Sequence, residues 1–513
     1  MRRRIRAAQL LFLAGDVHRS LEQLEVLDPS GLTTPDLERA LPLLLDMTEL
    51  VHGADAATAI VTRAVREAGA DPRRRALVLA LASDVAYGIR GRRREAAEES
   101  VRDAEAAGPA ADASLHRALI NLLVAKVTAG DGLDRRLLDR AERIEARVHI
   151  DRLHDTAELH RGLWSRYVED PDGARAALRR CITRAREAGD DFALATFCGY
   201  LAATEELAGD YAAASEALAA GDVAARWHDW PRLPWRLEPR CELLIASGQL
   251  DAAARLADQD LPDSADTPAA ARFLGAVVRG QVWAWRGDSA AAVRHFERAA
   301  ECADECEYAD PGVRQGLDAA LAEEYILEGR TDDARRIAAR LRDIGARLGR
   351  PGVTGAAHRI DGLAAAQAGD LDGAAQLARQ AVAAHEPSPL RPELARSLLT
   401  LGQIERRRRA RHESRVALSR AADLARDMGH RPLLARIEGE LPRVAAERTG
   451  DQLTVTEQRV AQLIADGATN REAAAALFVS VRTIETHVAA IYRKLHVRTR
   501  AQLARRLSQE SAR

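Results

Sequence analysis

The stretch LAGDYAAASEAL, residues 207–218, returns along the chain with small changes. It recurs as ASGQLDAAARLA at 246–257, WRGDSAAAVRHF at 285–296, LEGRTDDARRIA at 327–338 and AGDLDGAAQLAR at 368–379. The glycines of these five copies are separated by 39, 39, 42 and 40 residues. A fixed period of this length is typical of proteins built from stacked structural repeats. This period therefore decides the fold before any single motif does.

Each copy predicts a helical hairpin. The glycine ends the first helix, because it adopts a positive φ without a Cβ clash. The aspartate that often follows it, as at Asp210, suits the start of the second helix, where N–H groups are free. Five residues after the glycine stands an alanine, which lets two helices approach closely: Ala96, Ala214, Ala253, Ala292, Ala334 and Ala374. One helical face collects Leu371, Ala374, Ala375, Ala378 and Val382.

The fold class that follows is all-α, a tetratricopeptide-like helical-hairpin solenoid with a period of 39–40 residues. A HEAT-like solenoid has a similar period and is the alternative. The composition agrees, since aromatic residues make up only 4% and strands favour aromatic and β-branched residues. Extending the period backward gives Asp170 in place of glycine, then Gly130, Gly91, Gly53 and Gly15, and extending it forward gives Arg409. We therefore expect eleven units over residues 1–441, forming a sensor or partner-binding region.

Two stretches interrupt the repeats. WHDWPRLPW, residues 227–235, holds Trp227, Trp230 and Trp235 and is a candidate patch for a ligand or partner. The alternative is a long loop that packs on neighbouring repeats. EPSPLRP, residues 386–392, marks a connection between units. Cys302 and Cys306 have the spacing of two metal ligands on a helix, but no further ligand follows at a fitting distance, so we expect core packing and no metal site.

The C-terminal residues 453–513 form a separate module after a polar linker at 442–452. Capping boxes begin at Thr454, Thr469 and Thr499, and Ser480 can cap a further helix. These caps predict four helices, at 455–465, 470–477, 481–495 and 500–507. The second and third helices, joined by a tight turn, have the layout of a helix-turn-helix.

The third of these helices has two different faces. Its apolar stripe predicts the side toward the domain core: Ile484, Val488, Ile491 and Leu495. Away from that stripe lie Arg482, Glu485, Thr486, Ala489 and Arg493. Small and polar residues there suit a helix that enters a major groove, although a solvated face is the alternative. Charge favours the groove: residues 451–513 hold ten Arg and Lys against six Asp and Glu, a net +4, whereas the whole chain carries -2.

Residues 453–504 resemble the LuxR-type helix-turn-helix domain of bacterial transcription regulators. The residues that carry the resemblance are Leu453, Thr454, Glu457, Val460, Gly467, Asn470, Glu472, Ala475, Leu477, Ser480, Thr483, His487, Ile491, Lys494, Leu495, Val497 and Arg500. The family usually has glycine where this chain has His496. Histidine tolerates a left-handed conformation better than most residues, so we expect the fold to persist.

The resemblance implies double-stranded DNA and RNA polymerase as partners, and a homodimer on DNA. Five cysteines in this length do not form a disulfide scaffold, so we expect a cytoplasmic location. The family's base-contacting positions map onto Glu485, Thr486 and Ala489. The phosphate-contacting side chains would be Arg471, Arg482, Thr483, Arg493 and Lys494. Pairing of two copies would use the last helix through Leu503 and Leu507, which could equally close the domain's own core.

Together, the repeats and this domain resemble the latter part of the large ATP-binding LuxR regulators. A phosphate-binding P-loop needs Gly-Lys followed by Ser or Thr, but Lys126 precedes Val127 and Lys494 precedes Leu495. We therefore expect no nucleotide cofactor. We also expect no enzyme, because no nucleophile with a base, carboxylate pair or metal cluster stands out. The expected function is a DNA-binding transcriptional regulator controlled by a small-molecule or protein effector at the repeats; the alternative is a repeat scaffold for a protein partner.

The missing P-loop lysine predicts that the purified chain neither binds nor hydrolyses ATP. Calorimetric titration of ATP with Mg²⁺ should give no binding heat, and a phosphate-release assay should give no turnover. Micromolar affinity for ATP would contradict this prediction.

Overall fold

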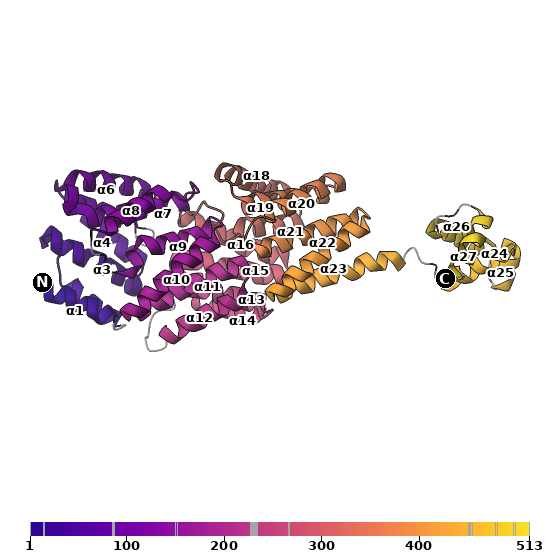
Figure 1. The fold of residues 1–513 in the computed structure, drawn as a ribbon, viewed down its shortest axis with the longest axis horizontal. Coiled ribbons are helices and arrows are strands. Elements are labelled where there is room, and N and C mark those ends of the chain that lie inside the picture. Colours follow the sequence, from indigo (N-terminus) through magenta and orange to yellow (C-terminus); the bar gives the residue numbers. More distant parts are fainter. Residues whose placement is uncertain are drawn as a thin grey trace.

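The computed structural model describes residues 2–13, 16–84, 88–148, 150, 152–225, 234–264, 267–449, 453, 455–477, 479, 481–495, 497 and 499–511. Over these residues the secondary structure consists of α-helices and three short 3₁₀ turns, without a strand (Figure 1). The predicted all-α fold is therefore confirmed. The 3₁₀ turns are η1 (Pro29–Gly31), η2 (Gly108–Ala111) and η3 (Leu153–Asp155).

Eleven helical hairpins follow one another in the described part of residues 2–428, as the repeat predicted. Their first helices are α1 (Arg2–Leu13), α3 (Thr34–His52), α5 (Pro72–Ala82), α7 (Asp112–Thr128), α9 (Ala157–Tyr167), α11 (Asp191–Ala208), α13 (Pro234–Ala246), α15 (Ala269–Arg286), α17 (Leu317–Leu327), α19 (Pro351–Gln367) and α21 (Arg391–Arg407). Their second helices are α2 (Val17–Glu25), α4 (Ala54–Arg66), α6 (Arg93–Ala107), α8 (Arg135–Glu145), α10 (Pro171–Ala188), α12 (Tyr211–Ala225), α14 (Leu250–Asp260), α16 (Ser289–Glu305), α18 (Thr331–Leu348), α20 (Leu371–His385) and α22 (Arg411–Met428). Helix α23 (Arg431–Thr449) follows the last hairpin.

The turns inside several hairpins have the predicted chemistry. Gly209 takes a left-handed φ of 82° at the end of α11, and Asp210 Oδ1 accepts the N–H of Ala213 at 3.0 Å at the start of α12. Asp288 and Asp370 cap α16 and α20 in the same way. The alanines five residues after the turn are buried: Ala96, Ala214, Ala253, Ala292, Ala334 and Ala374. A larger side chain there would push the two helices of the hairpin apart.

The turn between α9 and α10 corrects one assignment. We expected Asp170 to replace the glycine, but the left-handed residue is Glu169, with φ 66°, and Asp170 is the N-cap that accepts the N–H of Gly173 at 2.9 Å. Long-range contacts hold the strained glutamate, whose carboxylate accepts the N–H groups of Gly352 at 2.8 Å and Val353 at 3.1 Å. Arg409 has φ 65° as predicted for its place in the period, and Gly15 lies outside the described residues.

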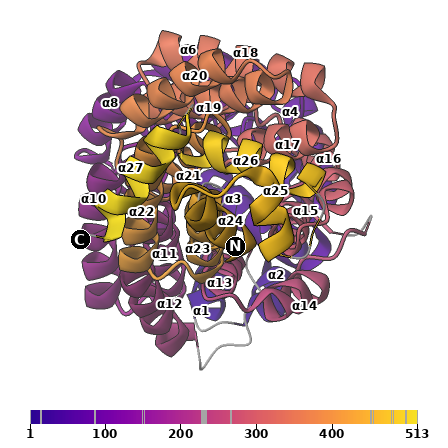
Figure 2. The ribbon, with the colours of Figure 1, turned by 90° about the vertical axis from the view of Figure 1, so that its right-hand side faces the viewer.

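Successive turns of the superhelix lie against each other. In the view along the long axis, most second helices of the hairpins lie toward the rim and most first helices lie inside (Figure 2). The carbonyl of Thr128 accepts the N–H groups of Ala309 at 2.7 Å and Asp310 at 3.1 Å. Arg350 donates to the carbonyl of Tyr167 at 2.5 Å and to Asp310 at 2.7 Å. The bonds from Thr128 and Tyr167 join residues about 180 apart and close the inner face of the solenoid.

Ion pairs join neighbouring hairpins at nearly the repeat period. Arg135 contacts Asp170 at 3.0 Å, and Arg298 contacts Asp263 at 2.9 Å, each 35 residues apart. Exposed pairs of this kind contribute little individually, about 0–1 kcal/mol. Their regular placement fixes the register between hairpins more than it adds stability.

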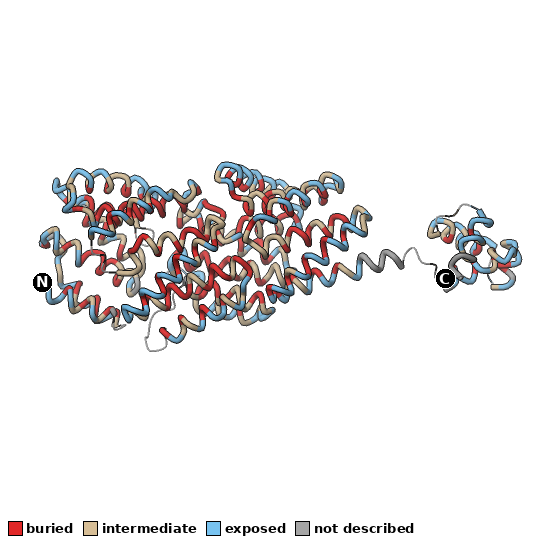
Figure 3. The backbone as a smooth tube through the Cα atoms, in the orientation of Figure 1, coloured by how far each residue is buried: buried red, intermediate tan, exposed pale blue. Residues whose placement is uncertain are grey.

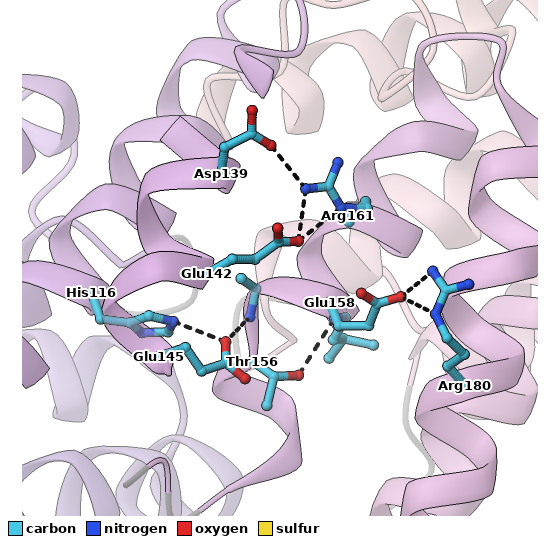
Figure 4. Close-up of polar contacts among 10 residues, drawn as sticks. His116, Asp139, Glu142, Glu145, Thr156, Glu158, Arg161 and Arg180 are labelled. Carbon is cyan, nitrogen blue, oxygen red and sulfur yellow. Dashed lines mark hydrogen bonds and ion pairs between the residues drawn. The ribbon is translucent and has the colours of Figure 1, made fainter. Parts of the chain in front are cut away.

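Figure 4 shows this polar layer between α7, α8, α9 and α10. Arg161 of α9 donates to Glu142 of α8 at 2.7 Å, and the buried ring of His116 lies 3.3 Å from Glu145. Glu145 also accepts the N–H of Ala157, the first residue of α9, at 2.8 Å. One carboxylate of α8 thus positions both the preceding and the following helix.

Buried residues run along every hairpin of the repeats (Figure 3). Cys302 and Cys306 are among them, which confirms their assignment to the core. Among the residues that the structure describes, no group of His, Cys, Asp and Glu is arranged to hold a metal ion. None of the described helices is long and apolar enough to cross a membrane.

Two predicted features fall wholly or partly outside the described residues. Trp227 and Trp230 lie there, and Trp235 belongs to α13 but its side chain is not described, so the tryptophan patch stays a prediction. The linker predicted at 442–452 begins inside α23, which continues through Pro442 to Thr449. A proline ring there removes one hydrogen bond of the helix without ending it.

Substitution of Gly312 by alanine should loosen the contact between superhelical turns. A Cβ at Gly312 would lie 2.0 Å from the carbonyl oxygen of Tyr167 and 2.8 Å from Arg350 Nη2, so the backbone must shift. We expect a destabilisation of about 1–3 kcal/mol, measured by thermal unfolding of the full chain. Gly439→Ala in α23 is the matched control, because nothing lies within 4 Å of its Cβ position. Equal unfolding midpoints for the two variants would contradict this account.

Candidate nucleic-acid interface

The C-terminal domain consists of α24 (Val455–Ala465), α25 (Asn470–Ala476), α26 (Val481–Leu495) and α27 (Arg500–Ser511). The first three end within one residue of their predicted bounds, and α27 extends four residues beyond 507. Gly467, with φ 99°, follows the end of α24. Ile484 and Ile491 of α26 are fully buried against Val460 of α24 and Leu503 of α27. The predicted core stripe is therefore confirmed, with Val488 and Leu495 partly buried beside it.

One predicted capping box is complete, and the threonine cap of a second is present. Glu472 accepts the N–H of Thr469 at 2.7 Å, and the Thr469 hydroxyl accepts the N–H of Glu472 at 3.2 Å, so the two residues cap α25 reciprocally. The N–H and the hydroxyl of Thr469 both donate to this carboxylate and hold the pKa of Glu472 below its usual value. Thr499 accepts the N–H of Gln502 at 3.2 Å and caps α27. Thr454, Ser480 and His496 lie outside the described residues.

The outward face of α26 is open to solvent. The three predicted base-contacting residues are all exposed: Glu485, Thr486 and Ala489. The Thr486 hydroxyl donates to the carbonyl of Arg482 at 3.0 Å, so its oxygen remains available as an acceptor. Four of the predicted phosphate-contacting residues are exposed as well: Arg471, Arg482, Thr483 and Arg493. The face therefore combines short side chains with flanking positive charge, as a helix in a major groove requires.

Lys494, another predicted phosphate contact, is turned toward the domain. Its Nζ lies 2.6 Å from Glu457 of α24, and the side chains are 16% and 7% exposed. This pair joins α24 to α26 from inside the domain, a role that sequence reasoning missed because it assigned Glu457 to a cap and Lys494 to phosphate. The phosphate contact of Lys494 stays a prediction, and any test of it must separate DNA affinity from domain stability.

Arg500 also has a structural role that sequence reasoning missed. It donates to the carbonyl of Ala468 at 2.7 Å and to the side chain of Asn470. These bonds tie the start of α27 to the loop between α24 and α25. In α27, Leu503 is fully buried in its own domain and Leu507 is partly buried. Leu503 therefore closes the core of one copy, whereas Leu507 keeps part of its apolar side chain outside that core.

Comparison with known proteins agrees with this geometry. Residues 451–507 match the family model described as bacterial regulatory proteins, luxR family. An HTH-type transcriptional regulator of Mycobacterium tuberculosis is 43% identical over 68 residues, which are 13% of this chain and 8% of that protein. The transcriptional regulatory protein YhcZ of Bacillus subtilis is 49% identical over 53 residues, 10% of this chain and 25% of that protein. The chain thus spans a quarter or less of the curated relatives it matches, and the shared part is the DNA-binding helix-turn-helix domain.

The fold of the repeats also has a counterpart among solved structures. A Rap protein complexed with competence and sporulation factor superposes on 70% of this chain and 97% of its own, with a TM-score of 0.50 and 13% sequence identity. At this identity the similarity concerns the fold alone. The chain is thus a tetratricopeptide-like solenoid followed by a LuxR-type helix-turn-helix domain.

Replacing Lys494 by alanine should lower the stability of the C-terminal domain even in the absence of DNA. The substitution leaves the Glu457 carboxylate buried without its cation, which costs about 1–3 kcal/mol. Hydrogen exchange of α24 and α26 in the full chain should become about tenfold faster or more.

Arg482→Ala is the matched control, because this basic side chain of the same helix is exposed and should leave exchange unchanged. The double variant Glu457→Gln with Lys494→Met should recover part of the protection. Unchanged exchange in Lys494→Ala would show that the pair does not hold the two helices.

Proposed function

We propose that the chain is a cytoplasmic DNA-binding transcriptional regulator whose helical repeats control the C-terminal domain. The observation that carries this proposal is the solvent-facing side of α26, within a domain that matches the luxR family. That face has the short and polar residues that read bases and the arginines that bind phosphates. RNA polymerase at the regulated promoter and a second copy of the chain on DNA belong to the same proposal. We propose regulation without catalysis and without a nucleotide cofactor.

Base reading is assigned to Glu485, Thr486 and Ala489 on the outward face of α26. The Glu485 carboxylate weakens the attraction to phosphate, which is compensated where it accepts a hydrogen bond from a cytosine amino group. The Thr486 methyl and Ala489 are suited to contact a thymine methyl group. Arg471, at the start of α25, and Arg482, at the start of α26, flank this face and would fix the register on the backbone.

The repeats are proposed to receive the signal. Their similarity to a Rap protein complexed with competence and sporulation factor supports this, since that solenoid carries a bound factor. We propose that the effector site lies inside the solenoid, because the stacked turns close its inner face. The second candidate function is a scaffold that binds a protein partner and uses the C-terminal domain only for docking. The DNA experiment that follows distinguishes the two functions.

Glu485→Ala should relax the preferred DNA sequence at one base pair. Loss of one acceptor in the groove removes discrimination of about 1–3 kcal/mol at that position, while affinity for unrelated DNA stays equal or rises. Selection from random DNA by the full chain and by the variant measures the change directly.

Arg471→Ala provides the matched comparison, because an exposed phosphate contact carries no sequence information. It should weaken binding to all sequences and lower the salt slope by about one. If Glu485→Ala selects the wild-type sequence, the carboxylate does not read a base. If the full chain selects no sequence at all, the scaffold function is the better one.

A further inference from the structure

A cavity of about 240 Å³ lies inside the solenoid. Its wall is built mostly from the first helices of successive hairpins, from α9 to α21, and from α23. The volume lies just below the range for drug-sized ligand sites, about 300–1,000 Å³, and would hold a small molecule or one peptide side chain. Because the site is enclosed by many hairpins, a ligand there contacts several repeats at once.

Most acidic side chains of this wall are neutralised by arginine. Glu238 lies 3.2 Å from Arg166, and Glu323 and Glu393 lie 2.8 and 2.6 Å from the buried Arg359. In these pairs each carboxylate has a cation at contact distance, which offsets the cost of taking both charges out of water. These paired carboxylates are therefore not available to bind a cationic ligand.

Glu206 of α11 and Glu242 of α13 differ from these pairs. Both line the cavity from neighbouring first helices, and neither forms an ion pair with a cationic side chain in the described part of the chain. Arg396, whose charge acts on both, is itself placed 3.7 Å from Glu393 and over the ring of Trp285. Two neighbouring carboxylates thus face one cavity without a counter-ion of their own.

Further acceptors at the same wall lack donors. Oε2 of Glu324, a side chain of α17 that is 7% exposed, is buried without a hydrogen-bond partner, and so is Oε1 of Gln281 in α15. Orphan donors are present on Arg166, whose charge Glu238 already neutralises. A buried acceptor without a donor costs about 1–3 kcal/mol, so these oxygens are suited to a ligand that donates N–H groups.

The electrostatics of the two carboxylates agree with the geometry. Burial, followed by repulsion from Glu242 and Glu238, raises the pKa of Glu206 well above its usual value, against the opposing charges of Arg166 and Arg396. Burial raises the pKa of Glu242 to about 7, with a hydrogen bond from Gln281 opposing the shift and Glu238 adding to it. Near neutral pH the pair therefore holds a proton in place of a cation.

We propose that this cavity binds an organic cation, an ammonium or guanidinium group held between Glu206 and Glu242, with the free oxygens of Gln281 and Glu324 as further acceptors. The cation belongs to a small amine or to the side chain of a basic peptide. Its binding displaces the shared proton. That the cation is the signal of the regulator rests on the proposed function, whereas the binding itself does not.

Calorimetric titration of the full chain tests the binding with agmatine, cadaverine and the tripeptide Gly-Arg-Gly as probes. At least one of them should bind with a Kd below about 1 mM, and 1-pentanol should not bind. At pH 7 the heat should depend on the ionisation enthalpy of the buffer, with release of up to about one proton per bound cation. Agmatine binding tighter than Gly-Arg-Gly identifies a small amine, and the reverse order identifies a peptide.

Glu206→Gln and Glu242→Gln should each weaken binding of the best probe by about tenfold or more and change the number of protons released. Because amides keep the shape and remove the repulsion, both variants should fold. Glu216→Gln on the exposed side of α12 is the matched control and should bind as the wild type does. Absence of binding by all three cations, or equal affinity of the wild type and both cavity variants for the best probe, would overturn the cation site. Cation binding that leaves affinity for the selected DNA unchanged would keep the site and remove its regulatory role.

Discussion

Arg350 is the residue on which the closed shape of the solenoid depends. Its guanidinium joins Asp310 to the carbonyl of Tyr167, in a turn of the superhelix about 180 residues earlier. The Glu169 side chain completes this junction from the same earlier turn, through the N–H groups of Gly352 and Val353. Without such junctions a solenoid of hairpins has an open concave groove, to which only neighbouring repeats contribute. With them, repeats far apart in sequence enclose a common interior.

The local part of this fold is readable from the sequence. A glycine every 39–42 residues marks a left-handed turn, an aspartate after it caps the next helix, and an alanine five residues later sits in the hairpin interface. All three signals act within one hairpin. The left-handed turn at Glu169 was not predicted from the sequence, because residues 350–353 hold its strained backbone in place. No local sequence pattern connects those residues to Glu169. The cavity was not predicted for the same reason. The sequence period predicts each hairpin, but it does not predict how many hairpins make up one turn of the superhelix.

The C-terminal domain shows the same division between local and distant determinants. Spacing along α26 separates the outward residues Glu485, Thr486 and Ala489 from the buried Ile484 and Ile491, because a helix repeats every 3.6 residues. The same reasoning left Lys494 on the outer side. Its partner Glu457 lies 37 residues earlier on another helix, and a flexible lysine reaches whichever side offers a buried carboxylate. Side-chain length, rather than helical phase, decided that position.

The two carboxylates of the interior connect the fold to the proposed signal. Their raised pKa values mean that the folded chain keeps protons that the unfolded chain has released above the ordinary glutamate value of 4.5. The contribution of these two groups to the stability of the folded chain therefore falls as the pH rises from about 4.5 toward 7, and at neutral pH it is unfavourable. A bound cation pairs with the ionised carboxylates, so that their contribution to the stability of the folded state becomes favourable. Binding to the folded state alone stabilises it by mass action. The same cation would tighten the stacked turns that enclose it, so a single charge at the centre would act on every hairpin of the wall.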